Sequence, residues 1–179
     1  MKRSRQARLK RLDNAPIETI EAVAENMKER VYATITLLAV ITALWQSANE
    51  HTAIGALASI VGTAVALWLA TLVAARMSHH AIRGRGMTMR EVKKLLFSSS
   101  GLFAPVLVPA IFIFFSMTGR ISLRTALFTG VISLLLSLFL LSYYAGRRIH
   151  TNTLQLVLMS SFEFLLGVGV IALKILVGE

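Results

Sequence analysis

An acidic residue lies in the middle of a long apolar stretch near the C-terminus. Glu163, between Phe162 and Phe164, belongs to the stretch from about Thr153 to Val177. At 1.5 Å of rise per residue, a helix over this stretch places the carboxyl group about 15 Å deep, near the centre of a bilayer. Inserting an aspartate at that depth costs roughly 2.5–3.5 kcal/mol, and such groups mark proton or cation pathways or hydrogen-bond to a neighbouring helix. Glu163 is therefore the first candidate for a proton or cation site.

Two prolines interrupt another apolar stretch at a similar depth. Pro105 and Pro109 are four residues apart and follow Gly101. Each proline lacks an amide donor and displaces the carbonyl four residues earlier, so the carbonyl oxygens of Gly101 and Pro105 are expected to lose their helical partners. Such oxygens coordinate ions in several transporter folds, although a plain kink is the commoner outcome. The pattern predicts that these oxygens and Glu163 form one polar site near the middle of the membrane.

A further oxygen for this site is available from Thr63. Hydroxyl groups in apolar helices also serve as hydrogen bonds between helices, and the nearby small residues Gly55, Ser59 and Gly62 suit close packing or a homodimer face. The sequence has no cysteine, no phosphate-binding glycine motif and no nucleophile elbow. We therefore expect neither an enzyme nor a bound cofactor.

Helices that cross a membrane are needed to position these residues. Of the 179 residues, 55% are hydrophobic and only 16% are charged, whereas soluble domains have about 25% charged residues. Continuous apolar stretches of roughly 20 residues predict membrane-spanning helices, because backbone groups find no water in lipid. There are five: Val31–Gln46, Ala53–Met77, Leu95–Thr118, about Leu123–Tyr144 and about Thr153–Val177. The expected fold is an all-α, single-domain bundle of five transmembrane helices over residues 31–179.

Two polar segments precede this bundle. Residues 14–30 predict an amphipathic helix, because Asn14 can cap it, Pro16 suits its first turn, and an apolar stripe lies opposite a row of glutamates. Residues 1–13 form a basic arm without aromatic residues on which nucleic-acid bases could stack. Each basic residue near an anionic membrane gains about 1 kcal/mol. We therefore expect lipid headgroups, and no nucleic acid, to contact the six basic residues Lys2, Arg3, Arg5, Arg8, Lys10 and Arg11.

The basic residues are distributed unevenly between the two sides of the predicted bundle. Of the 19 Lys and Arg residues, all but Arg120, Arg124 and Lys174 fall on the side of the N-terminus. Short cytoplasmic loops carry the excess of Lys and Arg in membrane proteins. The sequence therefore predicts a multi-pass protein of the plasma membrane with a cytoplasmic N-terminus and an external C-terminus.

The order of the stretches resembles that of known membrane proteins. The segments Arg30–Tyr32, Ala66–Ala70 and Ala172–Lys174 resemble a group of uncharacterised small bacterial integral membrane proteins. More distantly, the layout is similar to that of the vacuolar iron transporter family. In this layout two spans are followed by a connector and three further spans, and the first of those three contains prolines. Members of that family are dimeric five-helix exchangers of divalent cations. Its first-span acidic residue and its acidic domain have no counterpart here, so the resemblance implies the scaffold and a dimer rather than iron as the substrate.

Two functions are compatible with this sequence. The first is a small transporter or transporter-like protein that binds protons or cations at Glu163, Gly101, Pro105, Pro109 and Thr63. The second is an accessory or scaffold subunit of a larger membrane complex, in which the same groups only hold the helices together.

Overall fold

The computed structural model describes residues 17–149 and 153–177, and every element in these ranges is a helix. The predicted all-α fold is confirmed. The basic arm and the start of the predicted amphipathic helix, residues 1–16, lie outside the described residues. The elements in chain order are α2 (Ile17–Gln46), α3 (Ala53–Arg83), α4 (Met89–Ser99), the 3-10 helix η1 (Ser100–Phe103), α5 (Ala104–Met117), α6 (Leu123–Ile149) and α7 (Thr153–Val177).

Helix α2 joins the predicted amphipathic segment to the first apolar stretch without a break. No glycine or proline occurs between Ile17 and Gln46, so nothing in the sequence ends the helix at Arg30. Where α2 enters its apolar part, the buried hydroxyl groups of Thr34 and Thr42 donate to backbone carbonyls four residues earlier, at 2.7 Å each. These threonines are therefore satisfied within their own helix.

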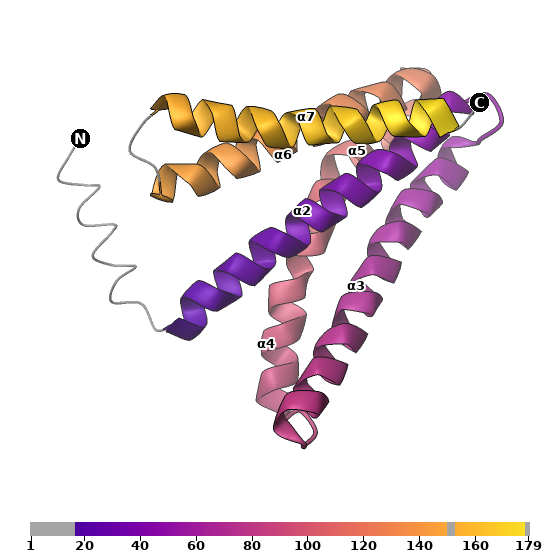
Figure 1. The fold of residues 1–179 in the computed structure, drawn as a ribbon. Coiled ribbons are helices and arrows are strands. Elements are labelled where there is room, and N and C mark those ends of the chain that lie inside the picture. Colours follow the sequence, from indigo (N-terminus) through magenta and orange to yellow (C-terminus); the bar gives the residue numbers. More distant parts are fainter. Residues whose placement is uncertain (1–16, 150–152, 178–179) are drawn as a thin grey trace.

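The centre of the bundle is α2. It packs against α3, α4, η1, α5, α6 and α7, and it crosses in front of α5 and η1 in the view of Figure 1. Its buried side chains include Ala33, Leu37, Leu38 and Ile41. The last three belong to one core cluster with Leu134 and other residues of α6. The long apolar part of α2 therefore faces protein on most sides.

Four segments around α2 are long and apolar enough to cross a membrane: Ala53–Arg83, Met89–Met117, Leu123–Ala145 and Leu154–Val177. In the most apolar 18-residue stretch of each segment, only 17–39% is buried inside the protein. Apolar side chains on the remaining surface face outward, as membrane-spanning helices require. By length and composition, the protein is therefore a multi-pass membrane protein. The first of the five predicted spans, Val31–Gln46, is not among these four segments.

Several helix ends gather at one end of the structure. Near the end of α7, Lys174 and Val177 line an open pocket with Gln46 and Glu50 from the end of α2 and the turn that follows. At the same end, the guanidinium of Arg124 at the start of α6 lies over the ring of Trp45, 5.7 Å from its centroid. Figure 1 shows α2, α3 and α7 converging here and diverging toward their other ends.

Candidate functional site

Glu163 lies on α7, on the side of this helix that packs against α6 and α2. Its side chain is half-buried, one turn before the buried Gly167. A Cβ added to Gly167 would lie 2.8 Å from Leu135 and 3.5 Å from Leu38, so α7 approaches both neighbours closely there. Within the described part of the chain, Glu163 makes no hydrogen bond or ion pair. The carboxyl group is therefore available for a proton, a cation or water.

The helix break that the prolines predict is present. Helix α4 ends at Ser99, η1 follows over Ser100–Phe103, and α5 begins at Ala104 with Pro105 in its first turn. A missing amide costs nothing in a first turn, which explains why the chain restarts a helix there. The amide of Ala104 donates to the Gly101 carbonyl, so this oxygen is not left free as expected. Pro109 lies inside α5 and is buried.

The expected site residues fall into separate places rather than one cluster in the described structure. Gly101, Pro105 and Pro109 share the broken helix, while Thr63 lies on α3 and donates its hydroxyl to the Ser59 carbonyl at 2.7 Å. Helix α5 packs on α6, α3 and α2, whereas α7 packs on α6 and α2. Glu163 therefore belongs to a different layer of the bundle from the break.

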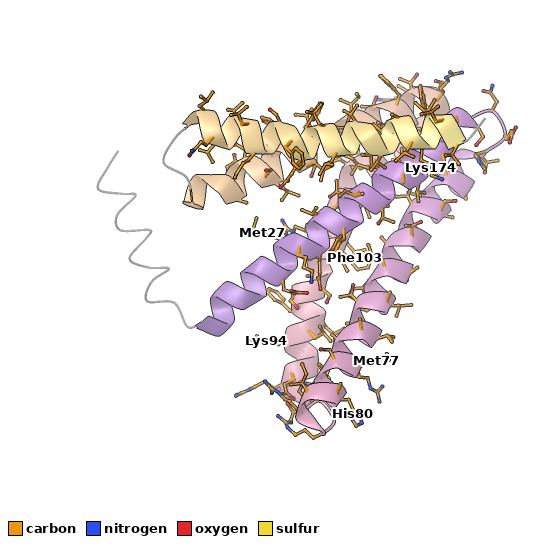
Figure 2. All side chains as sticks on the ribbon, viewed as in Figure 1. Met27, Met77, His80, Lys94, Phe103 and Lys174 are labelled. Atoms are coloured by element: carbon orange, nitrogen blue, oxygen red, sulfur yellow. The ribbon has the colours of Figure 1, made fainter. Side chains whose placement is uncertain are left out.

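Helix α2 occupies the place beside the break that was expected for Glu163. A Cβ added to Gly101 would lie 2.6–2.9 Å from the side-chain amide of Asn26, so only glycine allows this approach without displacing Asn26. The Asn26 amide donates to the backbone carbonyl of Ser98 at 2.5 Å. The ring of Phe103 packs on Trp68 of α3, with the centroids 6.0 Å apart. Figure 2 shows where Phe103 lies. The break is therefore held between α2 and α3.

A second acidic residue of α2, Glu29, is buried at this crossing. Only 5% of Glu29 is exposed, and Ser99 of α4 is completely buried against it. The Ser99 hydroxyl donates to Oε1 of Glu29 at 3.4 Å, and Oε2 is buried without a hydrogen-bond donor. The neighbouring Arg30 also has a buried Nε without a partner. Glu29 is thus enclosed, and Arg30 is partly buried, each with one buried polar atom that lacks a partner. Such atoms are costly and are common at functional sites.

The surroundings of Glu29 favour its protonated form. Glu29 precedes the apolar part of α2, which begins at Val31. Burial raises the pKa of its carboxyl above the ordinary value of 4.5, and the nearby Glu25 raises this pKa further. The Ser99 hydrogen bond and Lys28 act in the opposite direction and are the smaller effects. Glu29 is therefore a carboxyl group whose proton is held more tightly than that of a surface glutamate.

Sequence reasoning missed Glu29 because it was assigned to the polar row of an independent amphipathic helix. The buried residues of α2 recur every four positions, at Glu29, Ala33, Leu37 and Ile41. That spacing keeps side chains on one face of a helix. Extending the apolar stripe backward from Ile41 along one continuous helix would have placed Glu29 on the buried face.

Among the residues that the structure describes, no group of three or more His, Asp or Glu side chains could hold a metal ion. No protein-family model matches the chain, and no curated protein or solved structure matches it either. The resemblance to the vacuolar iron transporter family stays a prediction.

Proposed function

We propose that this multi-pass membrane protein moves protons or small cations across the bilayer, with Glu29 as the carboxyl group that binds and releases them. The observation that carries the proposal is the burial of Glu29, with one carboxylate oxygen lacking a donor, where α2 crosses the helix break. A buried carboxyl whose pKa is raised by burial suits the binding and release of protons. A hydroxyl and a carboxylate oxygen are also acceptable ligands for a hard cation.

The helix break supplies a means of opening the site. Ser99 is the last residue of α4, and the 3-10 turn of η1 separates it from α5. Short 3-10 segments inside a longer helix often mark hinges. The Ser99–Glu29 hydrogen bond is long at 3.4 Å and therefore weak. A rotation of α4 about η1 that breaks this contact would give Glu29 access to water on the side of the α3–α4 loop.

The proposal includes the predicted topology. In this proposal α2 also crosses the membrane and brings the number of spans to five. Its apolar part can be short because the four other spans surround it. The basic end of the bundle faces the cytoplasm of a plasma-membrane protein, and Glu163 on α7 is a second carboxyl group on the route. Its place on the face of α7 that packs on α2 supports this assignment.

Flux measurements in liposomes test the proposal. The purified protein is reconstituted into liposomes that enclose a pH-sensitive dye. If it moves protons alone, it should collapse an imposed pH gradient. If it exchanges protons for cations, it should do so only with Na⁺ or K⁺ on the opposite side. Glu29→Gln keeps the size of the side chain and removes its charge, so we expect it to abolish flux. Glu50→Gln, at an exposed position after α2, is the matched control and should retain flux. Glu163→Gln should reduce flux if the second carboxyl lies on the route.

The alternative function is that of an accessory or scaffold subunit of a membrane complex. The 2.5 Å bond from Asn26 to the Ser98 carbonyl favours it, because this contact ties α2 firmly to α4. Under this alternative, the wild-type protein conducts no ion under any gradient, and Glu29→Gln changes only its stability. If folded wild-type protein gives no flux in liposomes, the transport proposal is wrong and the scaffold function takes its place.

A further inference from the structure

The end of the α3–α4 pair combines positive charge with exposed apolar side chains. Between residues 76 and 94 the sequence contains six basic residues and one acid, Glu91. We call this end the basic tip and define it by its exposed basic residues, which are Arg76, Arg83, Arg85, Arg90, Lys93 and Lys94. Figure 2 places His80 and Lys94 near this end of the pair, away from α7.

The carboxylate of Glu91 already binds residues in and next to the loop between α3 and α4. One of its carboxylate oxygens accepts from the amide and hydroxyl of Thr88 at 2.8 Å each, which caps α4. The other accepts from Arg83 at 2.9 Å and from Arg85 at 3.2 Å. The loop between α3 and α4 is therefore folded around this carboxylate. The single acid cannot also neutralise the remaining cations of the tip.

Three cations of the basic tip remain without a counter-ion. Arg76, Arg90 and Lys93 are exposed, and none of them forms an ion pair within the described residues. Arg83 and Arg85 share one carboxylate, and their side chains are about half exposed. A guanidinium presents planar pairs of donors that match phosphate oxygens, so this set of side chains suits phosphate monoanions.

Large apolar side chains are interleaved with these cations. Ile82 is 79% exposed and Met89 is 75% exposed on either side of the α3–α4 loop, and Phe97 is 84% exposed two turns further along α4. In water, this arrangement leaves apolar area uncovered. In the headgroup region of a bilayer, it places apolar groups toward the acyl chains and cations at the level of the phosphates.

We propose that the basic tip binds the headgroups of anionic phospholipids in the same bilayer that α3 crosses. Charge complementarity and the continuity of the tip with the apolar helix α3 favour this partner. The site differs from the N-terminal arm and from the Glu29 site, and it does not depend on the proposed transport. Binding here would fix the end of α3 and the start of α4 at the membrane surface.

Lipid retention by the intact protein in detergent tests this proposal. Native mass spectrometry should show phosphatidylglycerol retained in preference to phosphatidylcholine. The double variant Arg90→Glu with Lys93→Glu should bind phosphatidylglycerol at least about 30-fold more weakly, because the loss of two basic residues beside an anionic surface alone accounts for that factor. Both positions are exposed, so circular dichroism should confirm that the variant folds.

A matched control removes the same charge from the opposite end of the bundle. Arg120→Glu with Lys174→Glu should leave phosphatidylglycerol retention within about twofold of the wild type. Equal loss in both double variants would overturn the proposal, because it would show a general charge effect. Equal retention of the two lipids by the wild type would also overturn it. Competition by millimolar inorganic phosphate that removes the preference would assign the tip to free phosphate instead of lipid.

Discussion

The side-chain amide of Asn26 donates to the backbone carbonyl of Ser98 at 2.5 Å, and so joins α2 to α4 across 72 residues of sequence. The same Asn26 side chain fills the space beside Gly101, where any larger residue would meet it. One contact therefore sets both the position of α2 and the residue type at the helix break. It also brings Glu29, one turn further along α2, against Ser99.

Substitution of Gly101 tests this contact. Gly101→Ala should destabilise the protein by about 1–3 kcal/mol, because the new methyl group displaces Asn26 from its hydrogen bond. Asn26→Ala alone should cost about 1 kcal/mol. The double variant should cost less than the sum of the two, since the small side chain at position 26 leaves room for the methyl group. Thermal unfolding in detergent gives all three values.

Gly62 of α3 provides the control for this pair. A Cβ added there meets nothing within 4 Å, and alanine favours helix over glycine by about 1 kcal/mol. Gly62→Ala should therefore be neutral or stabilising. A cost of Gly101→Ala that does not change when Asn26 is removed would contradict the proposed contact.

Acidification should stabilise the folded protein through Glu29. The pKa of Glu29 is raised in the folded protein above its ordinary value of 4.5, which applies to the unfolded chain. In the pH window between the unfolded-state pKa and the folded-state pKa, the folded protein therefore binds more protons than the unfolded chain. Stability must then fall as the pH rises through the window and increase as the pH is lowered toward 4.5. Thermal unfolding between pH 8 and pH 4.5 measures this slope. In Glu29→Gln the slope should be smaller, whereas Glu50→Gln should retain it.

Thr88 caps α4 and is expected to stabilise the α3–α4 loop. Thr88→Ala removes the hydroxyl that accepts from the Glu91 amide, and loss of such a cap costs about 1 kcal/mol. The exposed Ser78, near the end of α3, makes no side-chain hydrogen bond in the described structure. Ser78→Ala is therefore the control and should be neutral in the same thermal unfolding assay. Equal effects of the two substitutions would argue against the cap.

Cysteine labelling tests whether α2 crosses the membrane. The chain has no cysteine, so single cysteines can be introduced without other substitutions. With five spans and a cytoplasmic N-terminus, a membrane-impermeant maleimide should label Asn49→Cys and Arg120→Cys in intact cells. It should label Glu25→Cys and Gly86→Cys only after permeabilisation. If only the four apolar segments span, positions 25 and 49 will be labelled from the same side.

The sequence was most informative where one local interaction decides the structure. Thr88 and Glu91 have the three-residue spacing of a capping box, and α4 begins at Met89 with that capping box in place. The prolines predict a break in the third apolar stretch, which η1 provides. Each of these features depends on residues within a few positions of one another, so neither requires knowledge of the tertiary packing.

The residues that meet at the candidate site could not be predicted from such local patterns. Depth along a helix axis can be counted from the sequence, and it placed Glu163 and the break at a similar level. Depth does not show which helices are neighbours, and in the structure α2 lies beside the break. The division of α2 into an amphipathic helix and a separate span also hid Glu29, because the buried stripe crosses that boundary.

The central place of α2 has a consequence for how the protein is made. This helix is the first described element to leave the ribosome, yet two of its packing partners, α6 and α7, are the last. Until α7 is synthesised, Leu38 lacks the neighbour that closes over it near Gly167. Nascent chains must therefore keep α2 from non-native contacts until synthesis is nearly finished. Proteins truncated before Thr153 should accordingly be degraded in the cell rather than accumulate as a smaller bundle.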